Sequence, residues 1–152
     1  MNETYLILVT VDYSRTLAEM VAAGKYDWIS EDMVEQNFSI RRPTERPVSI
    51  VEIVLVHINK QVGLKKVLRH LDRRGLRPAT IEELLAIGEH FPNLQRQFPI
   101  VGLGSSWIGP DGRRCVPCLR QGFGNHKAKR HLRLHWCSYT WGRGYRFAAV
   151  RK

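Results

Sequence analysis

Two cysteines and a later histidine–cysteine pair carry the side chains that bind zinc in small proteins. Cys115 and Cys118 have the spacing of a zinc knuckle, and His135 and Cys137 follow, with His135 seventeen residues beyond Cys118. However, this CxxC lies in a strand-like run, where residues three apart point to opposite faces of a sheet. No second CxxC is present, and Pro117 stands where a knuckle turn favours glycine. We therefore expect no cofactor and keep a zinc site of Cys115, Cys118, His135 and Cys137 as an alternative.

Serines and carboxylates form no recognisable catalytic set. Ser105 and Ser106 lack the flanking glycines of a nucleophile elbow, and GLGSSW lacks the GK[ST] ending of a phosphate loop. No acid follows Asp111, which excludes paired-carboxylate chemistry from the last forty-one residues. A cysteine–histidine pair is the nucleophilic arrangement that stays open. We expect a protein that is not an enzyme.

Charge is distributed unevenly along the chain. The net charge is +10, but residues 1–57 hold five lysines and arginines against nine acids, whereas residues 58–152 hold nineteen against five. Such a field attracts anionic partners, nucleic acid first among them. The segment GNHKAKRHLR (124–133) supplies Lys127, Lys129 and Arg130 as phosphate contacts, and Trp107, Tyr139 and Tyr145 could stack on bases. No helix-turn-helix, zinc-finger or RNP signature accompanies this segment, so nucleic-acid binding stays an alternative.

The segment HLRLHWCSYTWGRGYRF (131–147) combines a regular apolar frame with residues that share no chemical theme. In a strand, Leu132, Leu134 and Trp136 would face the core, and Trp141 would anchor the following loop. The intervening residues would then form one exposed surface, with Trp107 and residues 123–130 at its edge. These candidate ligand-binding residues are His131, Arg133, His135, Cys137, Ser138, Tyr139, Thr140, Arg143 and Tyr145.

The elements that must position this surface follow from local patterns. Apolar, β-branched runs predict strands at 4–13 and 48–58, separated by a charged, proline-containing loop at 41–47. Capping-box spacings begin helices at Thr16 and Thr80, and Gly75 ends a further helix over 62–76. A short helix is also expected within 25–40. From Pro99 onward, four short strand-like runs predict an antiparallel meander, which makes the fold class α+β.

Four stretches of the sequence resemble a known family. These are LRHLDRRGLRPATIEELLAI, FPIVGLGSSW, GRRCVPCL and LRLHWCSYTWGRGYRFAAVRK. Over residues 62–152 they resemble the C-type lectin fold and, more narrowly, the variable proteins of diversity-generating retroelements. The resemblance implies a lectin-like domain at 47–152, with two helices packed on a small antiparallel sheet. Residues 1–46 would form an N-terminal β-α extension. Such lectin-like domains also occur in bacterial proteins related to the formylglycine-generating enzymes, but no cysteine pair here matches the active site of those enzymes.

In the retroelement family, an error-prone reverse transcriptase rewrites adenines that are copied into the 3′ end of the gene. The reachable residue types exclude Lys, Glu, Gln, Met and Trp, and each exposed residue named above belongs to the allowed set. Lys127 and Lys129 do not, and no asparagine occurs between 131 and 145. The resemblance therefore implies a non-catalytic protein with a diversified binding surface at about 123–145. Because that surface is basic and aromatic, we expect an acidic protein or other macromolecule as its ligand.

The N-terminus lacks the pattern of a secretory signal, and the longest apolar runs have the length of strands. Three cysteines, an odd number, do not make a disulfide framework. These observations favour a cytoplasmic location without a membrane partner, and a separate export route stays open.

Overall fold

The computed structural model describes residues 3–41 and 47–152, with only the backbone for residues 3 and 4. It is an α+β structure with a mixed sheet of nine strands in the described residues, larger than the sequence predicted. The main strand order is β1-β3-β9-β5-β7-β8-β2, while β4 pairs with β9 and β6 with β7. The elements are β1 (Glu3–Asp12), α1 (Leu17–Ala23), β2 (Trp28–Ile29), β3 (Val48–His57), α2 (Leu64–Arg73), β4 (Leu76–Pro78), α3 (Ile81–His90), α4 (Leu94–Gln97), β5 (Ile100–Val101), β6 (Trp107–Ile108), β7 (Arg114–Gln121), η1 (Gly124–His126), β8 (Arg130–Trp136) and β9 (Arg146–Arg151).

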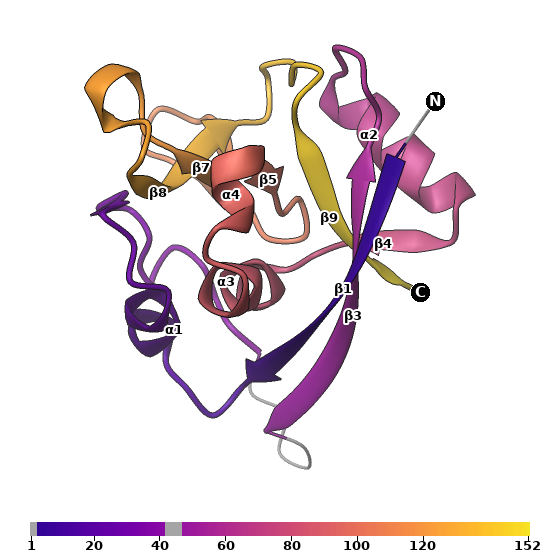
Figure 1. Ribbon diagram of the computed structural model, residues 1–152. Coiled ribbons are helices and arrows are strands. Elements are labelled where there is room, and N and C mark those ends of the chain that lie inside the picture. The colour runs from indigo at the N-terminus through magenta and orange to yellow at the C-terminus, as the bar shows by residue number, and fades with distance from the viewer. Residues whose placement is uncertain (1–2, 42–46) are drawn as a thin grey trace.

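The first two long strands, β1 and β3, form one antiparallel pair, which is conspicuous in Figure 1. Their register runs over ten pairs, from Glu3↔His57 to Asp12↔Val48, so β1 joins the sheet directly. Most of the predicted loop between them lies outside the described residues. Beyond β3, the chain continues into α2 and the elements that complete the sheet.

Local capping chemistry sets the ends of the helices. Thr16 and Thr80 each accept a backbone N–H three residues later, and Glu19 and Glu83 bond back to the N-cap backbone, so both predicted capping boxes are confirmed. Gly75, just beyond α2, adopts a φ of +70°, the left-handed conformation that glycine reaches without a Cβ clash. The predicted stop of that helix is also confirmed.

Two expectations about local structure are wrong. Residues 25–40 form no second helix; instead, β2 pairs in parallel with β8, and Asp27 and Ser30 donate backbone bonds to the carbonyls of Arg130 and Leu132. The last strands also do not form a simple meander. β7 and β8 are antiparallel neighbours, but β9 pairs with β3 antiparallel and with β5 in parallel. Both errors arise because pairing with distant segments decided the outcome.

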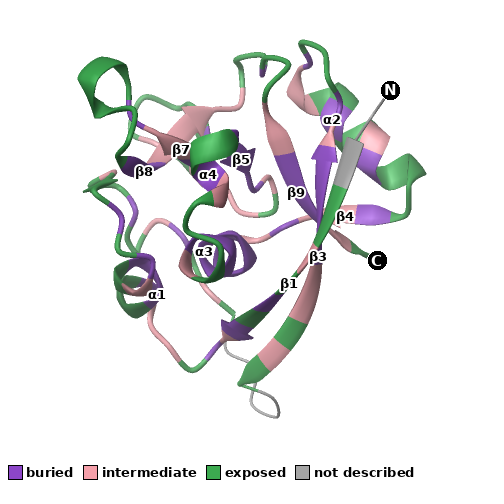
Figure 2. Ribbon diagram, in the orientation of Figure 1, coloured by how far each residue is buried: buried purple, intermediate pink, exposed green. Residues whose placement is uncertain are grey.

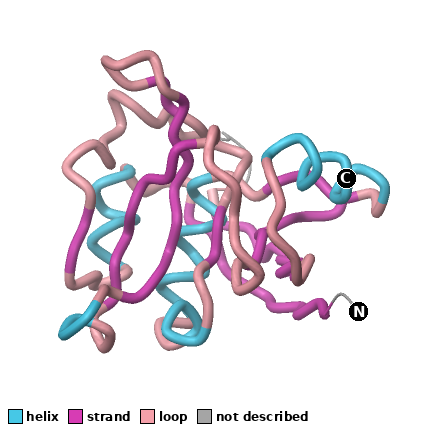
Figure 3. The backbone as a smooth tube through the Cα atoms, turned by 90° about the horizontal axis from the view of Figure 1, so that it is seen from above, coloured by secondary structure: helices cyan, strands magenta, loops and turns pink. Residues whose placement is uncertain are grey.

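Helices cover both faces of the sheet. Alternate residues of β3 face opposite ways: Ile53 and Leu55 pack in a core with α1 and α3, whereas Val54 and Val56 pack in a second core with α2. Figure 1 shows α2 on one side of the β1–β3–β9 strands and α3 on the other, and Figure 3 shows strands between two groups of helices. Figure 2 shows the resulting alternation of buried and exposed residues.

No helix in residues 3–41 and 47–152 is long and apolar enough to cross a membrane.

Candidate functional site

Strand β8 presents different chemistry on its two faces, because apolar and polar residues alternate along it. Leu132 lies opposite Leu119, and both are fully buried in the core beneath α3. Leu134 is partly buried against the same core, as the sequence predicted. The other face carries the polar residues at positions 131, 133 and 135, which lie opposite Arg120, Cys118 and Val116.

The polar face continues beyond β8 as a connected cluster of cationic and aromatic side chains. Arg133 lies over the ring of Trp28 at 4.6 Å and over that of Phe123 at 5.0 Å, and Arg120 lies over Phe123 at 4.3 Å. Arg120 donates to the hydroxyl of Tyr145 at 3.3 Å. We call this cluster the arginine–aromatic face; its members are Trp28, Arg120, Phe123, His131, Arg133, His135 and Tyr145.

Histidines connect the remaining members of the arginine–aromatic face. The hydroxyl of Tyr145 lies 3.2 Å from Nε2 of His135, whose ring packs edge-on against the tyrosine ring. Nε of Arg133 donates to Nδ1 of His131 at 3.1 Å, and the His131 ring lies 5.5 Å from that of Trp28. The neutral form of His131 supplies the acceptor nitrogen that the Arg133 contact needs.

Burial and neighbouring cations shift the pKa values of both histidines of the arginine–aromatic face. Burial lowers the pKa of His135 below its usual value, and the charges of Arg120 and Arg133 lower it further. Burial also lowers the pKa of His131, with further lowering by Arg133, His126 and Arg120. None of the seven members is an acid, so a bound carboxylate or phosphate would relieve repulsion between cations that the protein holds together.

Two predicted contact residues are buried instead of exposed. Arg130 is 4% exposed and donates to the carbonyls of Gly24, Lys25 and Gly88 and to Oε1 of Gln95. It is therefore structural, and its expected role as a phosphate contact is wrong. His131 is 8% exposed, because the Trp28 ring packs against it.

The other predicted residues separate into two groups around the arginine–aromatic face. Tyr139 packs edge-on against Trp136, and Trp107 lines a cavity of about 480 Å³ together with Trp136, Trp28 and Arg133. Asp32 and Asp111 also line this cavity, so its own charge is mixed. Trp107 thus shares this cavity with two members of the arginine–aromatic face, Trp28 and Arg133.

The second group belongs to the loop between β8 and β9. Fully buried Trp141 anchors this loop through a pair of backbone hydrogen bonds to Val62, as predicted. Thr140 accepts from Gln61 at 2.7 Å, the Arg143 carbonyl lies 2.8 Å from Nε2 of His57, and Ser138 is exposed. These contacts direct Thr140 toward α2 and away from the arginine–aromatic face.

The alternative zinc site does not form. Cys118 is fully buried in the core on the α2 side of the sheet, and Cys137 packs at the edge of that core. Cys115 lies opposite Trp136 in the register of β7 and β8. Within the described ranges, no three His, Cys, Asp or Glu side chains are close enough to hold a metal ion. Burial raises the pKa of the Cys118 thiol to about 12, which keeps it protonated.

Sequence reasoning missed two members of the arginine–aromatic face: Trp28 and Arg120. Trp28 reaches it through the parallel bridge between β2 and β8, more than a hundred residues away in sequence. Arg120 carried a usable signal, since it is two residues beyond Cys118 in one strand and therefore on the same face. Phe123, which is 54% exposed, lies within the segment 123–130 that the sequence analysis placed at the edge of the surface.

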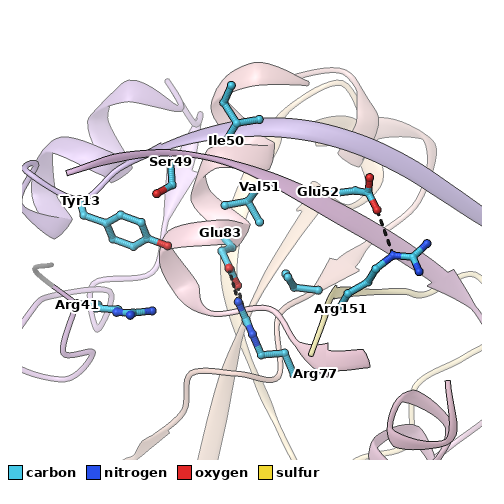
Figure 4. A pocket seen from close by; sticks show the side chains of 10 residues that line it. Tyr13, Arg41, Ser49, Ile50, Val51, Glu52, Arg77, Glu83 and Arg151 are labelled. Carbon is cyan, nitrogen blue, oxygen red and sulfur yellow. Dashed lines mark hydrogen bonds and ion pairs between the residues drawn. The ribbon is translucent and has the colours of Figure 1, made fainter. Parts of the chain in front are cut away.

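A different pocket, of about 500 Å³, lies beside the paired strands β1 and β3 (Figure 4). Its main polar group is Glu83, which forms two hydrogen bonds with Arg77 at 3.0 and 2.8 Å while also capping α3. A second pair, Arg151 with Glu52, spans 3.2 Å. These carboxylates already have partners, so we assign the pocket a structural role.

Compared with known proteins, the chain matches no protein-family model, no curated protein and no solved structure.

Proposed function

We propose that this chain is a non-catalytic ligand-binding protein of C-type lectin type, and that the arginine–aromatic face binds an acidic protein. One observation carries the proposal: Arg120 and Arg133 lie against aromatic rings, and neither forms an ion pair within the described ranges. Arginine and aromatic side chains dominate the energetics of protein interfaces. An unpaired guanidinium stacked on a ring is already oriented to bind a carboxylate in a bidentate manner.

The arrangement of residues 47–152 supports a lectin-like architecture. Two helices, α2 and α3, follow the first strand, and the last strand, β9, returns to lie antiparallel beside β3. The variable-looking segment then belongs to β8 and to the loop that leads into β9. Parallel pairing of β5 with β9 and the addition of β1 enlarge the sheet beyond the small antiparallel one that the resemblance implied.

The division between frame and exposed residues supports diversification of this surface. Leu132 and Trp141 are fully buried, so the fold depends on them, whereas Tyr139 and Arg143 are exposed and contribute little to the core. We propose that Arg133, His135, Tyr139, Arg143 and Tyr145 are one set of contacts among many that the same frame could carry. A ligand-binding surface on a scaffold that does not depend on it tolerates such change.

Two charge-matched double variants test the proposed site. Random peptides displayed on phage are selected on the wild-type protein and then measured against Arg120→Gln/Arg133→Gln and against Lys127→Gln/Lys129→Gln. We expect the selected peptides to be rich in Asp and Glu and to lose at least about tenfold in affinity for the arginine variant. The lysine variant carries the same charge change outside the arginine–aromatic face and should bind within a few-fold of wild type. Equal losses in both variants would reject the site.

Single-stranded nucleic acid is a second candidate ligand, favoured by the exposed rings of Phe123 and Trp28 beside the two arginines. Base–aromatic stacking would then contribute, and affinity would fall steeply with salt. Binding of an oligothymidylate that falls about tenfold or more in Phe123→Ala would favour this candidate. An unchanged affinity in Phe123→Ala would reject it.

A further inference from the structure

A small pocket beside α2 is lined mostly by basic side chains. It encloses about 230 Å³ between α2 and the turn that follows β3. Its apolar lining is Ile58 and Val62, both buried. Every other residue that lines it is basic: Lys60, Lys66, Arg69, His70 and Arg73. None of these belongs to the arginine–aromatic face.

The helix and the turn each contribute to this concentration of charge. Lys66, Arg69, His70 and Arg73 recur at intervals of three and four along α2, so they share one face of the helix. Asn59, with a φ of +62°, follows β3 and precedes Lys60, which lines the same pocket. Like charges three or four residues apart destabilise a helix. The fold therefore retains an unfavourable cluster.

No carboxylate neutralises the cluster within the part of the chain that the structure describes. The acid of α2, Asp72, pairs with Lys152 and does not line the pocket. Nε2 of His70 is shielded from solvent and has no hydrogen-bond partner among the described residues. Burial lowers the pKa of His70, and Arg74, Lys60 and Arg73 lower it further. A bound anion would reverse this repulsion and could accept a hydrogen bond from the imidazole.

We propose that this pocket is a second binding site, distinct from the arginine–aromatic face, for a phosphate or pyrophosphate group. Arginine forks and lysine point charges together provide the usual surroundings of phosphoryl oxygens. The volume is below the range of pockets that bind drug-sized molecules, which suits one or two phosphoryl groups. The apolar side chains Ile58 and Val62 limit the hydration of the site and so strengthen its electrostatics.

Titration of the full chain with inorganic pyrophosphate tests this site. Isothermal calorimetry at physiological salt should give one site per chain, and NMR should show a saturable shift of the His70 ring protons with a higher pKa for that imidazole. Arg69→Gln should weaken binding about tenfold or more, and Arg69→Lys should weaken it less. Lys65→Gln is the matched control, because Lys65 is exposed on the same helix but does not line the pocket.

Two results with pyrophosphate would overturn the site. One is the absence of a saturable His70 shift at millimolar pyrophosphate. The other is an equal loss of binding in Lys65→Gln and Arg69→Gln, which would indicate general attraction to a basic helix. An oligothymidylate without a terminal phosphate should leave the His70 signals unchanged; if it shifts them as pyrophosphate does, the ligand is a nucleic-acid backbone and the proposal fails. None of these outcomes depends on acidic peptides binding the arginine–aromatic face.

Discussion

Replacing Arg130 with methionine should destabilise the whole protein, although the sequence suggests that Arg130 is an exposed side chain in a basic loop. The Arg130 guanidinium lies between the C-terminal ends of two helices. Nη1 donates to the carbonyl of Gly24, the C-cap of α1, and Nη2 donates at 2.7 Å to that of Gly88 in the last turn of α3. Carbonyls at helix C-termini lack intrahelical partners, and the helix dipole favours a cation there.

The size of the effect follows from these contacts. Arg130→Met removes the bonds to the carbonyls of Gly24, Lys25 and Gly88 and a fourth, of 3.1 Å, to Gln95, and it leaves carbonyl groups buried without a donor. Methionine recovers part of the packing over the Tyr26 ring, and the cost of burying a cation disappears. We therefore expect a loss of about 3–5 kcal/mol in the free energy of unfolding.

Thermal unfolding followed by circular dichroism measures this loss. For a chain of this size, about 1 kcal/mol corresponds to about 2–4 °C, so Tm should fall by about 6–20 °C. Lys129→Met is the matched control, since Lys129 is the exposed neighbour with the same charge, and its free energy of unfolding should stay within about 0.5 kcal/mol. If Arg130→Met were as stable as Lys129→Met, the assignment of Arg130 as a structural link would be wrong.

Other expected outcomes concern a tyrosine, the cysteines and a histidine. Tyr26→Phe should raise Tm slightly, because the Tyr26 hydroxyl is buried without a hydrogen-bond partner within the described ranges, and a lower Tm would contradict this. Gly88→Ala should destabilise, since a Cβ there overlaps that hydroxyl, and Tyr26→Phe should rescue part of the loss in thermal unfolding. Iodoacetamide should label Cys137 before fully buried Cys118 in the native protein, and mass spectrometry showing the reverse order would contradict the burial. Burial lowers the pKa of His135 in the folded protein, so the contribution of His135 to stability is full above its unfolded pKa of about 6.5 and is lost as the pH falls through the lower folded pKa. His135→Gln should therefore reduce the loss of stability on acidification. A pH profile of stability that is unchanged in His135→Gln would contradict this.

Local patterns in the sequence predicted most of the elements correctly. The capping boxes at Thr16 and Thr80 involve residues three apart, so the chemistry that begins each helix is visible without knowledge of the fold. Alternation along β8 likewise identified Leu132 as a core residue. These features succeed because neighbouring residues are sufficient to determine them.

Features that depend on distant partners could not be predicted in this way. Burial of Arg130 requires the C-terminal ends of α1 and α3. Gly24, at the end of α1, is 106 residues earlier in the chain, and Gly88, in the last turn of α3, is 42 residues earlier. Trp28 reaches the arginine–aromatic face through a two-residue bridge that has no local signature. The pattern of β8 residues thus identified the correct strand, but it could not show that His131 would be covered by the Trp28 ring.

The central claim is that the ligand-contacting residues vary while the buried residues that support them stay constant. Deep sequencing of the 3′ end of this gene in a population of source cells tests this claim most directly. We predict substitutions concentrated in the codons of Arg133, His135, Tyr139, Arg143 and Tyr145. The codons of Arg130, Leu132 and Trp141 should stay unchanged, because these side chains are buried in the fold. A uniform sequence across the population, or substitutions equally frequent in the frame codons, would contradict the account.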